Sequence, residues 1–359
     1  MNESFEFFRS HPVGFLSDTP VPGAGIAISS RVRLARNLND YPFPQHCPAG
    51  MKKEICSTVL AAVKKLPVFS PRKGAMYFDL QTLDEHQKAV LLERRLASKE
   101  LLANGEGSML IVSADERSGI MVNEEDQLRI QCIAPGFTLS QLLCGINKID
   151  DKLAGLLDFA YDSRLGYLTA CPSNTGTGLR ASVMLHLPGL MMTEEIMPTI
   201  EGASKLHLAV RGLRGEGSKN SGSFFQISNQ FTLGIDENES VELLSNAITR
   251  IIEAEKSARM RLLESNRTTL YDRIGRAYGT LKYCYSISLD EAFNAISLLR
   301  LGVELGMFNA VDLPLINFLQ IAIQPGHLDC NITQEGSDCG CDARRALLCR
   351  SQLRPRQGA

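Results

Sequence analysis

Two stretches in the first third of the chain carry apolar residues at helical spacing. In residues 52–65, Ile55, Val59 and Ala62 recur every three or four positions, and residues 84–102 repeat this behaviour. Such spacing gathers apolar side chains on one face of a helix. We therefore predict an amphipathic helix over each of the two ranges.

The pattern changes to short apolar runs in the middle third of the chain. Residues 109–112 and 119–122 flank a turn-forming segment, and residues 128–132 alternate between apolar and polar. This combination is typical of antiparallel strands. Further strands are predicted at residues 207–210 and 223–228, on either side of a glycine-rich loop.

Helical spacing returns after Asp236. Val241, Leu244, Ile248 and Ile251 follow an i, i+3, i+7 rhythm. Additional helices are predicted over residues 264–281, 289–305 and 313–323. The chain is thus predicted to be α+β, with a sheet in its middle part and a helical C-terminal domain.

Composition shifts and chain breakers divide the sequence into three predicted segments. A run rich in proline and glycine closes residues 1–25, which predicts a flexible leader. The main domain is placed at residues 26–255 and the helical C-terminal domain at residues 256–359.

The overall charge is close to balanced. The 359 residues include 38 Lys and Arg against 40 Asp and Glu, a net charge of −2, which favours neither nucleic acid nor an anionic membrane as partner. No apolar run is long enough for a signal peptide or a membrane span. We expect a cytoplasmic protein that binds neither.

Ten cysteines are spread along the chain, and in a cytosolic protein we expect most to be reduced core residues. Four of them, Cys330, Cys339, Cys341 and Cys349, crowd the C-terminal end without a paired C-x-x-C spacing. We predict no metal site there, and a structural zinc or a redox role is the alternative.

Arg31 and Arg33 lie two positions apart, so on a strand both side chains project from the same face. Two guanidinium groups on one face repel each other unless an anion lies between them. The alternative is a solvated basic strand face that continues to Arg36.

Further arginines stand beside small or turn-forming residues: Arg129, Arg180, and Arg211 or Arg214. The planar guanidinium fork matches phosphate oxygens in a bidentate manner, so several arginines could hold a triphosphate. The sequence contains neither a Walker A loop nor the protein-kinase signatures.

Three carboxylates, Glu124, Glu125 and Asp126, follow Asn123 at the end of an apolar run. Such like charges repel unless a cation, a metal or a guanidinium group neutralises them. A carboxylate pair could align a guanidinium nitrogen and accept its proton, which is held with a pKa above about 12. A solvated turn is the alternative, with Asp126 as a turn residue.

Cys171 precedes a turn rich in proline and glycine, and Arg180 follows closely. A buried, inert cysteine is the ordinary interpretation. In an electropositive pocket, its thiolate would be favoured and could pair with a guanidinium group.

These segments, in this order, resemble the phosphagen (guanidino) kinase family. The motifs are Ser29-Ser-Arg-Val-Arg33, Asn123-Glu-Glu-Asp126 with Arg129, and Cys171-Pro-Ser-Asn174 with Gly176, Thr177 and Arg180. Residues 35–37, 178–184, 187–188, 211–218 and 226–230 are similar to the bacterial protein arginine kinase branch. The resemblance runs from Ile26 to Arg350.

The resemblance implies roles for individual residues. Glu125 would be the catalytic base, Glu124 would help to hold the guanidinium group, Cys171 would line the substrate site, and Glu216 could contact the target arginine. The nucleotide would be bound by Ser29, Ser30, Arg31, Val32 and Arg33, by Arg95 and Arg129, by Arg180, Ala181, Ser182, Val183 and Met184, and by Arg211, Gly212, Leu213, Arg214, Gly215 and Glu216.

The family also implies the fold, a glutamine-synthetase-like antiparallel sheet flanked by helices, which makes residues 26–255 the catalytic domain. Phosphagen kinases that act on small guanidines carry a helical domain before the first arginine motif. Here only a short leader precedes Arg31, which favours the branch that acts on proteins.

Three positions depart from the branch pattern. The phosphoarginine-binding motif R-D-x-x-R-A keeps Asp342 and Arg345 but has Cys341 in place of the first arginine. Gln127 and Arg95 stand where the branch has histidine. None of these changes removes a carboxylate or a phosphate-binding arginine, so we expect activity.

The resemblance implies ATP and Mg²⁺ as requirements and arginine side chains of proteins as substrates. Implied partners are a zinc-bearing activator protein, a heat-shock repressor and Clp protease components, and a homodimer or larger assembly is expected. The alternatives are a kinase for free arginine and a non-catalytic phosphoarginine-binding adaptor.

Overall fold

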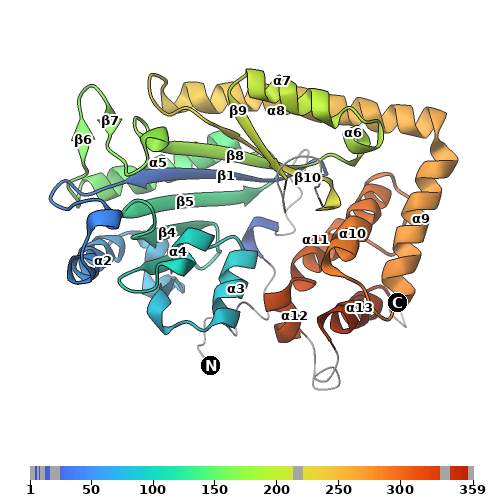
Figure 1. Cartoon of the computed structure of the whole chain (residues 1–359), viewed down its shortest axis with the longest axis horizontal. Coiled ribbons are helices and arrows are strands. Elements are labelled where there is room, and N and C mark those ends of the chain that lie inside the picture. Colours follow the sequence, from blue (N-terminus) through green and yellow to red (C-terminus); the bar gives the residue numbers. More distant parts are fainter. Residues whose placement is uncertain are drawn as a thin grey trace.

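The computed structural model describes residues 5, 8, 13–16, 25–212, 221–331 and 340–354. Eight strands form one antiparallel sheet in the order β2-β3-β4-β5-β1-β8-β10-β9 (Figure 1). The strands are β1 (Ala27–Arg36), β2 (Met76–Asp79), β3 (Met109–Val112), β4 (Ser118–Val122), β5 (Leu128–Pro135), β8 (Leu179–His186), β9 (Leu208–Gly212) and β10 (Phe224–Asn229). A separate hairpin pairs β6 (Tyr161–Asp162) with β7 (Gly166–Tyr167).

The register of the central strands separates a polar face from an apolar one. Arg33 on β1 lies opposite Gln131 on β5 and Arg180 on β8, so these three side chains share one face. The neighbouring residues Val32 and Leu34 point to the other face and are fully buried. That apolar face packs against α2 (Ala49–Val63), α5 (Leu139–Ala154) and α8 (Glu237–Ser265) to form the largest core cluster.

On the polar side, α3 (Glu85–Glu93) and α4 (Lys99–Ala103) pack against β2, β3 and β4 in a smaller core cluster. The prediction of one helix over residues 84–102 is wrong, because the chain breaks between α3 and α4. Arg95 adopts a left-handed φ of 57°, and Ser98 starts the second helix as its N-cap. The break leaves α4 beside the polar face of β5.

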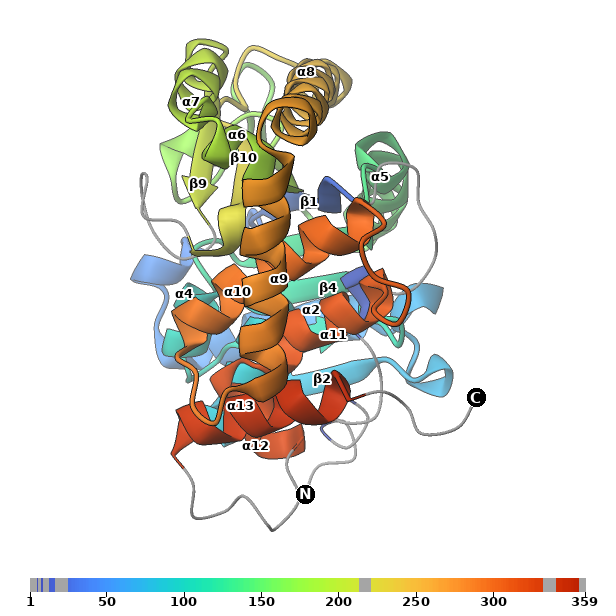
Figure 2. The same ribbon diagram turned by 90° about the vertical axis from the view of Figure 1, so that its right-hand side faces the viewer.

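The C-terminal helices form their own core cluster at one end of the molecule (Figures 1 and 2). They are α9 (Arg267–Tyr283), α10 (Leu289–Glu304), α11 (Leu313–Ala322), α12 (Pro325–Asn331) and α13 (Cys341–Gln352). Two short helices outside this group, α6 (Pro188–Met192) and α7 (Ile196–Lys205), connect β8 to β9. Helix α8 continues without a break past residue 256, so the placement of a domain boundary there stays a prediction.

The described residues of the first 25 are packed against the body of the protein. Phe5 and Phe8 belong to the cluster under α3 and α4, and Phe15 and Leu16 belong to a cluster with β1, β5 and α11. These described residues are therefore part of the packed structure and do not form the predicted flexible leader. Among the described residues, no helix combines the length and apolar content that crossing a bilayer requires.

The predicted α+β architecture, an antiparallel sheet flanked by helices and followed by a helical C-terminal region, is confirmed. Local patterns located β3, β4, β5, β9 and β10 as well as α8 to α11. Helix α5 and strand β8, which cover and extend the centre of the sheet, were not assigned from the sequence.

Candidate active site

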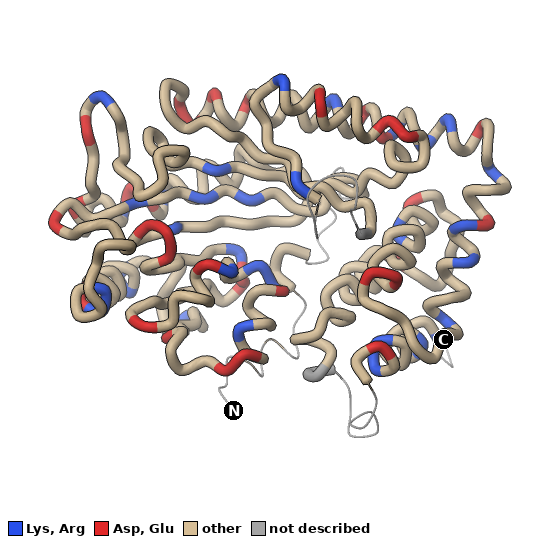
Figure 3. The backbone as a smooth tube through the Cα atoms, viewed as in Figure 1, with Lys and Arg blue, Asp and Glu red and all other residues tan. Residues whose placement is uncertain are grey.

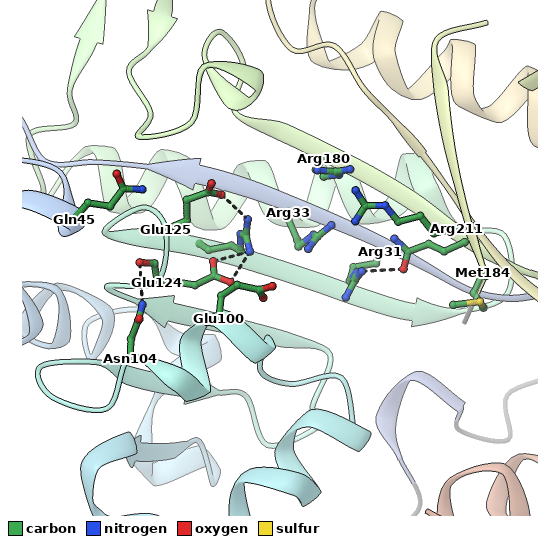
Figure 4. Close-up of a pocket in the computed structure, with 13 residues that line it drawn as sticks. Arg31, Arg33, Gln45, Glu100, Asn104, Glu124, Glu125, Arg180, Met184 and Arg211 are labelled. Atoms are coloured by element: carbon green, nitrogen blue, oxygen red, sulfur yellow. Dashed lines mark hydrogen bonds and ion pairs between the residues drawn. The ribbon is translucent and has the colours of Figure 1, made fainter. Parts of the chain in front are cut away.

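The polar face of the sheet forms the floor of a cavity of about 670 Å³ (Figure 4). The residues that line it come from five strands (β1, β5, β8, β9 and β10), from the turn between β4 and β5, from α4 and its C-cap, and from the segment around Gln45. The lining residues are Arg31, Arg33, Gln45, Glu100, Asn104, Glu124, Glu125, Arg129, Arg180, Met184, Arg211, Gly212 and Gln226. The cavity thus collects five of the predicted arginines and the predicted carboxylate pair in one place.

One end of the cavity is cationic. Arg31 and Arg33 come from β1, Arg180 from β8 and Arg211 from the edge strand β9, and Figure 3 shows basic positions along the strands of the sheet. Gln226 on β10 accepts a hydrogen bond from Nη2 of Arg31 at 3.1 Å. Alternation along each strand brings these side chains to the same face, as predicted for Arg31 and Arg33.

The arginines repel one another, and this makes the charged form of each guanidinium group less favourable. Burial and repulsion by neighbouring arginines lower the pKa of Arg31 to about 9. The same two causes lower the pKa of Arg33 well below its usual value and also lower the pKa of Arg180. The buried Nε atoms of Arg33 and Arg180 have no hydrogen-bond partner among the described residues. A polyphosphate fits this end, because its oxygens would accept these bonds and reduce the repulsion.

Arg95 lies next to this cationic end. Its guanidinium group stacks over the ring of Phe15 at 4.7 Å and lies 3.5 Å from Oγ of Ser29, to which it donates a hydrogen bond. Burial lowers the pKa of Arg95 to about 10. It is not among the residues that line the cavity, and nucleotide binding by Arg95 stays a prediction.

The opposite end of the cavity is acidic. Glu124 is buried, with Nη1 of Arg129 at 2.6 Å and a hydrogen bond from the hydroxyl of Ser98. Glu125 is less restrained: one carboxylate oxygen lies 3.5 Å from Nη2 of Arg129 and 3.5 Å from Nδ2 of Asn174. Its side chain is 35% exposed, so it can reach a group that enters the cavity.

The tight turn between β4 and β5 positions both glutamates. Asn123 has a left-handed φ of 58°, and its side chain amide donates hydrogen bonds to the carbonyl oxygens of Lys52 and Gly107. Asp126 is buried and accepts hydrogen bonds of 2.7 Å from Nδ2 of Asn37 and from the backbone N–H of Ala170. Asp126 therefore ties the glutamate turn to the segment that leads into Cys171.

Cys171 begins a short 3₁₀ turn, Pro172–Asn174, beside the acidic end. Its Sγ lies 3.0 Å from Oγ of Ser173. Cys171 is partly exposed but is not among the residues that line the cavity. The structure thus places it next to the predicted base, and its substrate-binding role stays a prediction.

Several predicted nucleotide-binding residues do not line the cavity. Val32, Ala181 and Val183 point to the opposite, apolar face and belong to the main core cluster. Ser30 is also fully buried, where its hydroxyl donates a hydrogen bond to the carbonyl oxygen of Gly136. The period of two along a strand explains this outcome, because it sends every second residue of β1 and β8 away from the arginine face.

Other predicted residues have different outcomes. Ser182 shares the polar face, since it pairs with Arg31 across β1 and β8, and it is buried. Leu213, Arg214, Gly215 and Glu216 lie outside the described residues. The structure therefore leaves the substrate contact predicted for Glu216 untested.

Sequence reasoning missed several groups that the structure brings to the site, among them Gln45 and Glu100 in the lining of the cavity. Ser98 bonds Glu124, Asn174 bonds Glu125, Gln226 bonds Arg31, and Asn104 donates to the backbone carbonyl of Glu124 at 3.3 Å. Only Asn174 and Gln226 stand inside segments that the family resemblance had marked. Ser98 and Asn104 reach the site because α4 packs beside β5.

The C-terminal motif is engaged in structural contacts. Arg345 is buried, where it donates hydrogen bonds to the carbonyl oxygens of Ile323 and Ile287 and to the carboxylate of Asp342. These bonds join the ends of α11 and α13. Phosphoarginine binding at Asp342 and Arg345 stays a prediction.

The described cysteines are all free, and four of them, Cys47, Cys56, Cys132 and Cys349, are buried. Cys341 is exposed, and the side chains of Cys330 and Cys339 are outside the described part of the chain. Within that part, no cluster of three or more His, Cys, Asp and Glu residues could hold a metal ion.

Comparison with known families accounts for the combination of an arginine cluster with a carboxylate pair. The family model "ATP:guanido phosphotransferase, C-terminal catalytic domain" matches residues 55–258. The chain belongs to the ATP:guanido phosphotransferase family. A second model, "Protein-arginine kinase McsB C-terminal domain", matches residues 267–358, so this member of the family is a kinase of the protein-arginine kinase branch.

Curated relatives agree over almost the whole chain. A protein-arginine kinase of Halalkalibacterium halodurans is 42% identical over 336 residues, which are 93% of each chain. One from Moorella thermoacetica is 41% identical over 332 residues, 92% of this chain and 95% of the relative.

Solved structures show the same fold in enzymes of the wider family. The match with lombricine kinase has a TM-score of 0.56 at 26% identity and covers 70% of this chain and 71% of that one. The substrate-free duplicated taurocyamine kinase from Schistosoma mansoni gives a TM-score of 0.57 at 23% identity, over 75% of this chain and 40% of that one. The fold resemblance predicted from the sequence motifs is therefore confirmed.

Proposed function

We propose that this chain transfers the γ-phosphoryl group of ATP to the guanidinium group of arginine side chains in proteins. The observation that carries the proposal is the distribution of charge within this cavity. Arginines that fit phosphate gather at one end, and Glu124 and Glu125 lie at the other. The name of the relatives, protein-arginine kinase, supports the choice of a protein substrate.

In the proposed reaction, Arg31, Arg33, Arg180 and Arg211 hold the triphosphate through charge-assisted hydrogen bonds. A guanidinium nitrogen of the target arginine attacks the γ-phosphorus, a nitrogen–phosphorus bond forms, and the bond to the β,γ-bridging oxygen breaks. ADP leaves with the electron pair of that bond, and the guanidinium proton passes to the carboxylate of Glu125. Glu124 is held by Arg129 and orients the acceptor group.

Mg²⁺ would enter with ATP and neutralise charge on the phosphates during transfer. The chemistry of the cavity fits this ion, because Mg²⁺ needs only one or two carboxylates besides phosphate oxygens and water. Glu100 on α4 is exposed and lines the cavity, so it can supply such a ligand.

The decisive experiment incubates the purified protein with Mg·ATP and casein and maps phosphosites by mass spectrometry without acid, beside a Glu125→Gln variant. We expect phosphoarginine from the wild type and a loss of at least about 100-fold in the variant, the lower end of the range for removing a general base. No phosphoarginine from the wild type, with or without an added activator protein, would refute the proposal.

Two alternatives are separated by the same assay. Phosphorylation of free arginine in place of casein would indicate a small-guanidine kinase. Absence of any ATP turnover would favour a non-catalytic phosphoarginine-binding adaptor, for which Asp342 and Arg345 are the motivation. The intact glutamate pair and arginine cluster favour a catalyst over an adaptor.

The cellular setting belongs to the same proposal. We infer a cytoplasmic kinase in protein quality control, acting with a zinc-bearing activator, a heat-shock repressor and Clp protease components, and assembled as a dimer or larger. The family branch supports these partners. Co-purification of the tagged protein and light scattering of the pure protein test the partners and the assembly.

A further inference from the structure

Three segments are bonded together beside the acidic end of the cavity. The β6–β7 hairpin pairs with the Cys171 loop, since Tyr167 and Gly176 exchange backbone hydrogen bonds of 2.8 and 3.2 Å. The segment after β10 holds the same loop, because the hydroxyl of Thr232 donates to the carbonyl oxygens of Ser173 at 3.1 Å and of Thr175 at 2.7 Å. Asn174 in this loop contacts Glu125.

Both flanking segments expose large apolar side chains. Tyr161 and Leu165 on the hairpin are 61% and 47% exposed, and Phe231 and Leu233 after β10 are 56% and 54% exposed. We call these four residues the apolar rim. A single exposed apolar residue is ordinary, but apolar residues gathered on segments that adjoin a reactive site mark a binding surface.

The rim residues are held in place rather than loose. The carboxylate of Asp162 accepts hydrogen bonds from the backbone N–H groups of Arg164 and Leu165, which fixes the tip of the hairpin. The ring of Tyr161 packs edge-on against Tyr167 at 5.3 Å. The ring of Phe231 packs against His207 at 4.9 Å. Pre-positioned side chains lose little conformational entropy when they bind a partner.

The hairpin itself is anchored to the buried side of the sheet that α5 covers. Tyr167 lies under the guanidinium group of the buried Arg36, 3.5 Å from the ring centroid. Arg36 in turn forms an ion pair of 2.7 Å with Asp150 on α5. In Figure 1 the β6–β7 hairpin projects at the left end of the main sheet, near α5.

We propose that the apolar rim binds the polypeptide on either side of the target arginine and selects substrates with apolar neighbours. This inference rests on the proposed function. The rim adjoins the loop that contacts Glu125, so it lies close to the polypeptide that flanks an arginine at the acidic end. The occupant is an extended or unfolded stretch, because apolar residues beside an arginine are accessible there and not in a packed core.

The test uses two peptides of equal length with one central arginine, flanked by leucine and phenylalanine in one and by serine in the other. Each peptide is incubated with the full-length protein and Mg·ATP, and mass spectrometry of the products gives kcat/KM for each peptide. We expect the apolar peptide to be preferred about five-fold to ten-fold, the effect of partly burying one or two apolar side chains. Equal kcat/KM values for the two peptides would overturn the proposal that the rim selects substrates. No phosphorylation of either peptide would also overturn the proposed function.

Variants locate the preference. Leu165→Ser and Phe231→Ser, each made separately, are expected to lower the apolar-to-polar ratio about three-fold or more. Met260→Ser is the matched control, because Met260 is 56% exposed and lies near the far end of α8. Ratios that stay at the wild-type value in both rim variants, or that fall equally in the control, would overturn the proposal.

Discussion

Arg33 on β1 and Arg180 on β8 lie directly opposite each other, and the Nε atom of each is buried without a hydrogen-bond partner among the described residues. Two like charges at paired positions of neighbouring strands destabilise a sheet. Their retention at the floor of the cavity is explained by an anionic ligand that bonds both groups.

This relationship predicts that replacing either arginine affects the stability of the free protein and the binding of ATP in opposite directions. Arg33→Met or Arg180→Met should leave the melting temperature without nucleotide unchanged or higher, because a repelling charge is removed. The stabilisation by ATP, about 2.7 kcal/mol at 100 times Kd, should be largely lost. Thermal unfolding with and without Mg·ATP measures both effects. Arg250→Met, at an exposed position of α8, is the control; a wild-type ATP shift in the site variants would contradict the prediction.

Asp126 is predicted to act by positioning, through its bonds to Asn37 and Ala170. Asp126→Ala should lower kcat for arginine phosphorylation about 10-fold to 100-fold with little change in KM for ATP, because the Cys171 loop is displaced from Glu125. Asp126→Asn keeps one accepting oxygen and should retain most of the activity. Steady-state kinetics on both variants decide, and equal losses would point to a role for the charge itself.

Gly176 joins the three segments beside Glu125 and cannot carry a side chain. Its φ is 114°, and a Cβ atom there would lie 2.1 Å from the carbonyl oxygen of Thr232. Gly176→Ala should lower the melting temperature and reduce arginine phosphorylation at least about 10-fold. Gly234→Ala isolates the backbone strain, since Gly234 has a φ of 78° with nothing within 4 Å of a Cβ, and should cost only about 1 kcal/mol. Similar activity losses in both would disprove the packing argument.

His186 predicts a pH dependence of stability. Burial, followed by the charges of Arg259 and Arg300, lowers the pKa of His186 well below 6.5, and its Nε2 lies 2.8 Å from Oγ of Ser297 on α10. The unfolded chain takes up a proton below about pH 6.5 and the native state does not. Stability should therefore fall with pH below 6.5, by up to about 1.4 kcal/mol per pH unit from this residue.

Urea unfolding of the wild type and of His186→Gln at pH 7.5, 6.5 and 5.5 checks this dependence. The variant is expected to be less stable at pH 7.5, because the bond to Ser297 changes, but its stability should fall less steeply on acidification. The other histidines contribute to both proteins and cancel in the comparison. Parallel pH profiles would show that His186 remains neutral in both native and unfolded states or charged in both.

Much of the fold followed from local patterns. The apolar runs at β3 and β4 and the helical rhythm of α8 arise from side chains within a few positions of one another, so they are visible in the sequence. The helix predicted over residues 84–102 failed at Arg95, where a left-handed backbone is stabilised by contacts outside the segment. Strand β8 was not assigned although its Arg180 was singled out.

The sequence predicted the chemistry of the site but only some of the residues that form it. Arg31, Arg33, Glu124 and Glu125 were identified from residue type, spacing and family motifs, and they do line one cavity. Val32 and its equivalents on β8 were assigned by motif, but the pleat turns them into the core. Ser98 carried no local signal for the site, since its role depends on where α4 packs.

The sequence by itself determined which residue types are available and the period of two that places Arg31 and Arg33 on one face of a strand. Tertiary structure decided which of them meet. Arg31 bonds Gln226 across 195 positions and Asp126 bonds Ala170 across 44. Such contacts depend on strand register and on how helices pack against the sheet, and a shift of register by one residue would turn the arginines into the core.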